Sequence, residues 1–389
     1  MRFSVLAFAA CALAARPFLD EPDTGIEEQL GGYVTNKTLP PLKALVGLPD
    51  FQWVARNFMG VKDYTYYRNG AAGEWSYRNN LEIFSRYRLR PRVFKDILNV
   101  GASLPTTILG HNFSAPFFIS PCARADYANP IAEVGLAKGA GDANILYMAS
   151  LFSSKSMEDI YAARANGSEQ VLFQQVYLTE NMTQTQELFK RIEKVGAKAI
   201  VMTVDSAGDG VRHRAKRFAV GSADSSLSLL TWDLYRQLSN MTSLPIIPKG
   251  IQTVEDAREA VKNGCKAIFL SNHGGRQSDT SPSSLQVAME IHQEDPSIFK
   301  EIEVYADGGV RYGTDILKLL ALGVRAVGVG RPFMFANIYG ADGVKAAADM
   351  LKYELLNDAA NIGVGDLKKI GPEIVSWKAS NPWVGNSEL

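Results

Sequence analysis

One segment of the chain combines a side chain that can accept a proton with a side chain that can bind a carboxylate. It reads Ser271-Asn272-His273-Gly274-Gly275-Arg276-Gln277 and follows the apolar run 267–270, which is typical of a buried strand. The two glycines allow a sharp turn where the strand ends. An imidazole can act as a general base, and a guanidinium can bind a carboxylate through two parallel hydrogen bonds. We therefore expect His273 and Arg276 to act on one small acid; a purely structural histidine is the alternative.

The elements that would position this segment follow a regular alternation. From about residue 115, short apolar runs alternate with amphipathic segments such as 183–195, 254–263 and 314–322. Eight such β-α units predict a closed parallel (β/α)8 TIM barrel over residues 115–389, with a doubly wound sheet as the alternative. The predicted strands are 117–121, 145–150, 171–177, 199–205, 244–250, 267–274, 303–309 and 326–332.

The residues before the barrel predict an N-terminal helical extension and cap over residues 16–114. Its first part, up to about residue 60, reads as an extended lead-in with a helix near 50–58, and a second helix is expected at 74–85. A chain of 389 residues with 46% hydrophobic residues can bury one large core, which fits a barrel with additions.

Polar and glycine residues lie at the ends of all the predicted strands. In such barrels the loops after the strands meet on one face, which is where the chemistry takes place. The strand-end residues are Pro121, Cys122, Ala123, Ser150, Gln174, Thr203, Asp205, Lys249, Ser271, His273, Asp307, Gly308, Gly309, Gly330 and Arg331.

The last two strands end in sequences suited to a phosphate group. The segments 307–311 and 330–332 read Asp-Gly-Gly-Val-Arg and Gly-Arg-Pro, and they would supply backbone N–H groups with Arg311 and Arg331 as cations. Lys249 ends an apolar strand, and a buried ammonium needs a partner of opposite charge. These features predict a phosphate-binding site and a negatively charged partner for Lys249.

Taken together, these motifs resemble the FMN-dependent α-hydroxy acid dehydrogenase/oxidase family, which includes glycolate oxidase, lactate oxidase, mandelate dehydrogenase and the flavin domain of flavocytochrome b2. The resemblance covers about residues 60–370. It implies FMN as the cofactor, with ring contacts from Ser150, Gln174, Thr203 and Ser271 and from the Pro121-Cys122-Ala123 segment. Lys249 matches the lysine that stabilises the anionic reduced flavin.

The resemblance also implies the roles on the substrate side. His273 would be the base, and Asp205 would stabilise its imidazolium form; whether a carbanion or a hydride is formed stays open. Arg276, Arg212 and Tyr66 would bind the carboxylate of the substrate, and Tyr177 lies near the position of a family tyrosine that contacts substrate.

Three departures from the family pattern affect the pocket for the substrate side chain. With Gln174 as the family glutamine, Val176 stands where a tyrosine is usual, and Tyr177 is one position away. The segment Ser150-Leu151-Phe152 lacks the tryptophan that several members carry, and the segment 206–210 lacks the usual proline.

The resemblance implies oxidation of an (S)-2-hydroxy acid to the 2-keto acid, with oxygen as the expected acceptor and hydrogen peroxide as the product. The alternatives are another electron acceptor in an L-lactate dehydrogenase, a monooxygenase, a specialised biosynthetic oxidase, and a flavin-binding protein without turnover. The family also implies a homotetramer. The formal net charge of zero and the pI near 6.9 give no reason to expect a nucleic-acid partner, and no metal site is expected.

The N-terminus and the sequons predict secretion. Residues 1–15 place one positive charge before a short apolar run that ends in small residues, as in a secretory signal peptide; an uncleaved tail or anchor is the alternative. No later stretch is expected to span a membrane. Sequons for N-glycosylation occur at Asn36, Asn112, Asn166, Asn181 and Asn240. Cys122 and Cys265 are expected at opposite rims of the barrel, too far apart for a disulfide.

Overall fold

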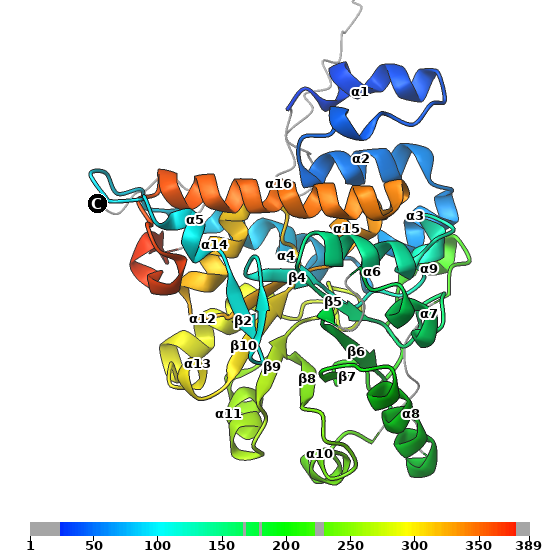
Figure 1. Ribbon diagram of the computed structural model, residues 1–389, viewed down its shortest axis with the longest axis vertical. Helices are drawn as coiled ribbons and strands as arrows, with labels where there is room; N and C mark the ends of the chain where they lie inside the picture. Colours follow the sequence, from blue (N-terminus) through cyan, green and yellow to red (C-terminus); the bar gives the residue numbers. More distant parts are fainter. Residues whose placement is uncertain (1–23, 166–168, 179–180, 222–228, 379–389) are drawn as a thin grey trace, which may run out of the picture.

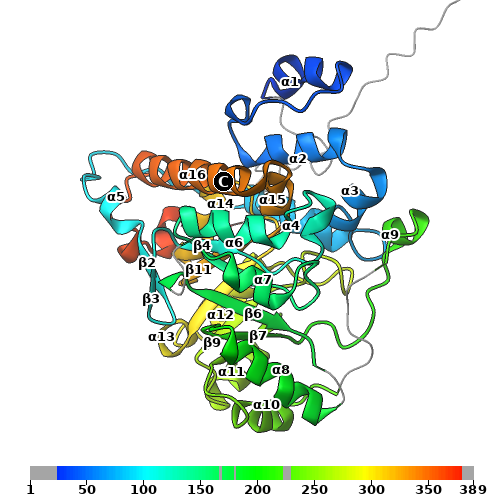
Figure 2. The same ribbon diagram turned by 45° about the vertical axis from the view of Figure 1, so that its right-hand side comes forward.

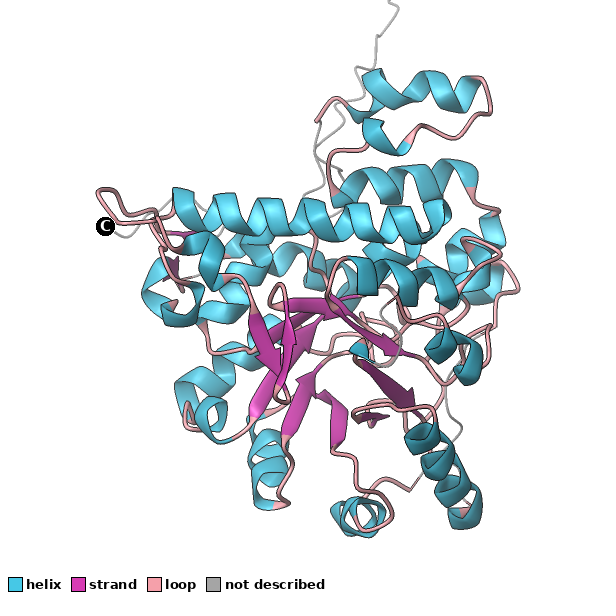
Figure 3. Cartoon of the chain, in the orientation of Figure 1, coloured by secondary structure: helices cyan, strands magenta, loops and turns pink. Residues whose placement is uncertain are grey.

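Eight parallel strands close into a barrel at the centre of the protein. The computed structural model describes residues 24–165, 169–178, 181–221 and 229–378, so the predicted signal segment 1–15 and the sequon at Asn166 lie outside the described residues. The strands pair in chain order, and the last one pairs with the first (Figures 1 and 3). This closure confirms the TIM barrel and excludes a doubly wound sheet. The strands are β4 (Phe117–Ile119), β5 (Leu146–Ala149), β6 (Leu172–Val176), β7 (Ile200–Thr203), β8 (Ile246–Ile251), β9 (Ala267–Leu270), β10 (Glu303–Asp307) and β11 (Ala326–Val329).

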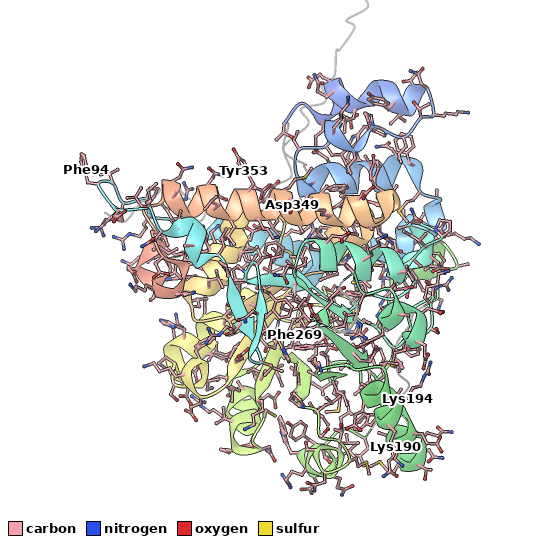
Figure 4. All side chains as sticks on the ribbon, in the orientation of Figure 1. Phe94, Lys190, Lys194, Phe269, Asp349 and Tyr353 are labelled. Atoms are coloured by element: carbon pink, nitrogen blue, oxygen red, sulfur yellow. The ribbon has the colours of Figure 1, made fainter. Side chains whose placement is uncertain are left out.

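Alternate strand residues fill the inside of the barrel. Large side chains from different strands, including Phe118, Phe269 and Tyr305, meet there with ring centroids 5.4–6.3 Å apart. Figure 4 shows Phe269 in the middle of the barrel. The barrel interior is therefore a packed core rather than a pore. Side chains along a strand alternate between two faces. A polar residue two positions after one of these rings therefore points to the same interior face, at the carboxyl-terminal end of its strand.

Helices cover the outside of the barrel, as the amphipathic segments predicted. Side-chain caps begin several of them: Asn181 accepts hydrogen bonds from the backbone of α8, and Thr253 accepts one at the start of α11. In the part of the chain that the structure describes, no helix is long and apolar enough to cross a membrane. The helices from the barrel onward are α6 (Glu133–Asp142), α7 (Met157–Ala162), α8 (Met182–Lys194), α9 (His213–Arg217), α10 (Trp232–Ser239), α11 (Val254–Lys262), α12 (Ser284–Glu294), α13 (Ile298–Glu301), α14 (Gly313–Ala321), α15 (Arg331–Ala336) and α16 (Gly340–Asn361).

The N-terminal extension begins with helices that lie together on one side of the barrel (Figure 2). It contains α1 (Ile26–Thr35), α2 (Leu48–Phe58), α3 (Val61–Tyr67), α4 (Trp75–Arg86) and α5 (Val100–Ser103), with short strands β1 (Arg88–Leu89), β2 (Thr106–Ile108) and β3 (His111–Phe113); β1 pairs with β12 (Val375–Ser376). Helices α2 and α4 confirm the two predicted helices. The extended lead-in is wrong over residues 26–35, where Gly31 and Gly32 lower the helix propensity but do not prevent α1 from forming.

Candidate active site

The carboxyl-terminal ends of the strands surround two connected cavities with empty volumes of about 650 and 360 Å³. Six residues line both of them, so the cavities form one site. The shared residues are Tyr66, Pro121, Ala123, Lys249, His273 and Arg276. The smaller cavity also has Ser150, Tyr177 and Thr203 in its wall, and the larger one has Cys122, Asp307, Gly308, Gly309, Arg311, Gly330 and Arg331. The structure thus brings together most of the predicted site residues.

His273 and Asp205 form a buried pair between neighbouring loops. Nδ1 of His273 lies 2.9 Å from Oδ1 of Asp205, whose side chain is fully buried behind the imidazole and does not line the cavity. This contact fixes the proton on Nδ1 and leaves the lone pair of Nε2 toward the cavity. Burial lowers the pKa of His273 below its usual value, and the Asp205 carboxylate opposes this effect. His273 is therefore a neutral base at pH 7.

The backbone of His273 has a strained conformation at the cavity wall. Its φ is 60°, in the left-handed region that residues with a Cβ rarely adopt. The backbone N–H of His273 donates to Oγ of Ser271 at 3.1 Å, and the two following glycines also have positive φ. The strain is thus fixed by the turn that the two glycines were predicted to form.

A hydrogen-bonded chain under the cavity holds Lys249. Its ammonium donates to Oγ of Ser271 at 3.0 Å, and Ser271 donates to Oδ1 of Asp307 at 2.7 Å. Ser120, which the sequence prediction did not include, donates to the other oxygen of Asp307 at 3.0 Å. Ser271 does not line either cavity, so its contacts orient Lys249 and Asp307. Lys249 itself lines both cavities and brings a positive charge to the centre of the site.

The groups predicted to bind a carboxylate cluster on the mouth side of the cavity. Arg276 and Tyr66 line both cavities. Burial raises the pKa of Tyr66 to about 12, so its hydroxyl stays protonated and can donate a hydrogen bond. Arg212 lies beside them without lining a cavity: its Nε donates to the carbonyl of Arg276 at 2.9 Å, and its charge acts on Tyr66. The hydroxyl of Tyr177 lies 3.4 Å from Nε2 of His273.

The structure corrects the prediction for the glutamine of the third barrel strand. Gln175 lines the cavity, where its Oε1 accepts from Ser150 at 3.2 Å and its Nε2 donates to Thr203 at 2.9 Å. Gln174 instead donates to backbone carbonyls outside the cavity. Strand alternation explains the difference, because Gln175 has the same parity as Phe173, which lies inside the barrel.

The same correction removes one of the expected departures from the family pattern. Tyr177 lies two positions after Gln175, so the tyrosine is in the usual place and Val176 points into the outer core. The ring of Tyr177 stacks on Phe152 with centroids 5.1 Å apart. Phe152 therefore supports the wall of the smaller cavity, in the segment that lacks the tryptophan found in several family members.

The far end of the larger cavity can bind an anion. The backbone N–H groups of Gly308, Gly309 and Gly330 have no hydrogen-bond partner among the described residues. The guanidinium of Arg331 is partly buried and donates to three backbone carbonyls, and desolvation lowers its pKa to about 9. Arg311 lines the same end. Such uncompensated donors and positive charge are what a phosphate needs.

Comparison with known proteins agrees with this geometry. The family model described as FMN-dependent dehydrogenase matches residues 55–226 and 220–377. The chain belongs to this family. It is 36% identical over 357 residues to 2-hydroxyacid oxidase 2 of Mus musculus, covering 86% of this chain and 99% of that protein. It is 33% identical to the L-lactate dehydrogenase (cytochrome) of Saccharomyces cerevisiae, covering 87% of this chain but only 61% of that protein's length.

Solved structures show the same relationship. The recombinant flavin-binding domain of baker's yeast flavocytochrome b2 matches with a TM-score of 0.84 and 33% identity, covering 95% of each chain. A mandelate oxidase variant matches with a TM-score of 0.77 and 31% identity, covering 84% of this chain and 99% of the other.

The residues present fit FMN, the cofactor of this family. The unpartnered N–H groups with Arg311 and Arg331 would hold its phosphate, and the larger cavity leads from there to the polar groups at the barrel mouth. Ser150, Gln175 and Thr203 would bond to the heteroatoms of the ring. Lys249 would lie beside it and supply the positive charge that a reduced flavin needs.

Proposed function

We propose that this protein oxidises an (S)-2-hydroxy acid to the 2-keto acid and passes the electrons through FMN to oxygen, which yields hydrogen peroxide. One observation carries the proposal: Asp205 holds Nδ1 of His273 at 2.9 Å, so that Nε2 is presented to the cavity. Lys249 and Arg276 line the same cavity as His273. A general base, a fixed cation and a carboxylate ligand thus surround one space.

The residues of the chain divide the work as follows. Arg276 binds the substrate carboxylate through its planar fork, with the hydroxyl of Tyr66 as a further donor. Nε2 of His273 takes a proton from the substrate, and Asp205 stabilises the imidazolium that forms. Bound FMN supplies the two-electron acceptor. Lys249 holds positive charge where electron density increases.

Oxygen is favoured as the acceptor by the oxidases among the relatives of this chain. These include 2-hydroxyacid oxidase 2 of Mus musculus, to which the chain is 36% identical. Measuring peroxide per flavin turnover tests this assignment; electron transfer to artificial acceptors without peroxide formation would favour a dehydrogenase.

The reaction itself is tested by an anaerobic screen of 2-hydroxy acids against the purified yellow protein. At least one (S)-2-hydroxy acid should bleach the flavin absorbance, and the matching 2-keto acid should appear in equal amount. His273→Gln should keep its FMN and lose flavin reduction by about 10²–10⁴-fold. A folded, FMN-loaded protein that no 2-hydroxy acid reduces would leave only a flavin-binding role.

Secretion and glycosylation remain part of the proposal. Support comes from residues 1–15 and from the surface position of Asn36, Asn112, Asn181 and Asn240, which are all exposed. Glycan transfer requires such access.

We also propose that copies of this chain assemble, with a homotetramer as the expected state. The loop after β1 exposes Val93, Phe94 and Leu98 by 76%, 104% and 91%, and Figure 4 shows Phe94 at the edge of the molecule. Exposed apolar side chains in one loop are typical of a contact surface. Light scattering of the wild type and of Phe94→Asp tests this; a wild-type monomer would contradict it.

A further inference from the structure

The loop after β4 carries an arginine that the reaction described above does not use. Arg124 directly follows Ala123, which lines both cavities. Its φ and ψ are 61° and 50°, a left-handed conformation that a residue with a long side chain seldom adopts. The hydroxyl of Tyr67 donates to the Arg124 carbonyl at 2.5 Å, and Glu133 accepts from the next backbone N–H at 2.9 Å. The fold thus holds Arg124 in a strained position next to the cavity wall.

Two aromatic rings connect this arginine to the site. Tyr66 lines both cavities and is 8% exposed, and its ring meets the edge of Tyr127 with centroids 5.0 Å apart. The guanidinium of Arg124 lies over the other ring of this pair, 4.2 Å from the centroid of Tyr127, and its side chain is 40% exposed. Arg124 lines neither cavity itself, and exposure increases along the series from Tyr66 at the cavity wall to the arginine.

The guanidinium has donors to spare. Nε and Nη2 donate to the two oxygens of Asp126 at 2.9 and 2.8 Å, whereas a guanidinium carries five N–H groups. The pair is half exposed, where an ion pair contributes little stability. A second carboxylate can therefore share Arg124 or displace Asp126 at small cost.

We propose that Arg124 binds a second carboxylate at the far end of the substrate, so that the preferred substrates are 2-hydroxy dicarboxylic acids. The inference rests on the proposed function, in which Arg276 holds the first carboxylate. Ala123, the residue before Arg124, lines the smaller cavity, so a substrate side chain that leaves the reacting carbon toward Ala123 would approach the loop that carries Arg124. Arg124 is then a specificity residue that contacts the substrate but takes no part in proton transfer.

The test compares two substrates of equal chain length, (S)-2-hydroxyglutarate and (S)-2-hydroxypentanoate, with the FMN-loaded enzyme under anaerobic conditions. In the wild type, kcat/KM should favour the diacid. Arg124→Gln should lower the diacid-to-monoacid ratio by about two- to fivefold, the scale of a lost half-exposed ion pair. Asp126→Asn removes the competing carboxylate and should raise the ratio, which keeps the test valid if Arg124→Gln folds poorly.

A matched control is available on the outside of the barrel. Arg191 on α8 makes the same two-pronged contact with Glu158, at 2.6 and 2.6 Å, and is 50% exposed. Arg191→Gln should leave the ratio unchanged. A wild type that prefers the monoacid, or a ratio that Arg124→Gln and Asp126→Asn both leave unchanged, overturns the inference while the proposed function stands. A protein reduced by neither these acids nor any other 2-hydroxy acid overturns both.

Discussion

The contact between Asp205 and His273 allows a quantitative prediction. Asp205→Asn keeps the size of the side chain and an oxygen that can accept from Nδ1, but it removes the negative charge. The carboxylate lies 2.9 Å from the imidazole, and its side chain is fully buried. Two unit charges about 4 Å apart attract by about 4 kcal/mol at an effective dielectric constant near 20. The imidazolium that forms in the transition state should lose most of this stabilisation.

A loss of about 3–4 kcal/mol corresponds to a reduction rate about 10²–10³-fold lower. Stopped-flow measurement of flavin reduction at saturating substrate gives this rate directly. The variant should stay yellow, because Asp205 lines neither cavity and the proposed flavin ligands are untouched. Asp50→Asn is a matched control: Asp50 is 5% exposed and accepts a backbone hydrogen bond at 2.6 Å on α2, away from the cavity.

The pH profile separates this explanation from a general loss of structure. Burial lowers the pKa of His273 below 6.5, and Asp205 raises it. The base is active when neutral, so the rate increases with pH up to that pKa and is constant above it. Removing Asp205 lowers the pKa further, so the acidic limb of Asp205→Asn should move to lower pH. A limb that moves to higher pH, or a rate close to that of the wild type, would refute the reasoning.

Three further predictions use the same protein. Gln175→Leu should weaken FMN binding by about tenfold, since it loses hydrogen bonds in the cavity, whereas Gln174→Leu should change it little; fluorescence titration with FMN measures both, and equal effects would contradict the assignment. Lys249→Met should lower the reduction potential of the bound flavin by on the order of 50 mV, because a positive charge beside it is lost; spectroelectrochemistry checks this, and an unchanged potential would exclude the role given to Lys249. Expression in a eukaryotic host should give a product without residues 1–15 that loses mass with glycosidase, and an unglycosylated chain that keeps Met1 would count against secretion.

The barrel was predictable because its strands and helices are periodic. Each predicted strand overlaps an observed one, and α8, α11 and α14 lie on the segments that the apolar spacing indicated. Helix α16 was not predicted, although it is 22 residues long. It packs against α6 and α14 and exposes Tyr353 on its outer face (Figure 4). Its apolar residues therefore face two neighbouring helices and do not form the single apolar stripe by which a helix is recognised in a sequence.

The site was predicted in its residue types but not in all its positions. The resemblance placed His273, Lys249 and Arg276 correctly at the cavity, but it chose Gln174 over Gln175. No propensity distinguishes two neighbouring glutamines. The signal that does is the alternation along the strand: Phe173 fills the barrel interior, and the residues two and four positions later are Gln175 and Tyr177.

The same alternation explains why polar side chains gather at the carboxyl-terminal end of the barrel. On every strand the residue that continues the interior face past the last core side chain is either a polar residue that can form hydrogen bonds or a glycine. These residues are Ser120, Ser150, Gln175, Thr203, Lys249, Ser271, Asp307 and Gly328. The alternation does not predict which hydrogen bonds these side chains make with one another. Lys249 is hydrogen-bonded through Ser271 to Asp307, and Arg212 donates to the carbonyl of Arg276. Both sets of contacts depend on loops whose paths are set by the whole fold. A sequence therefore predicts which side chains reach the site, and only the three-dimensional structure shows which of them hold the others in place.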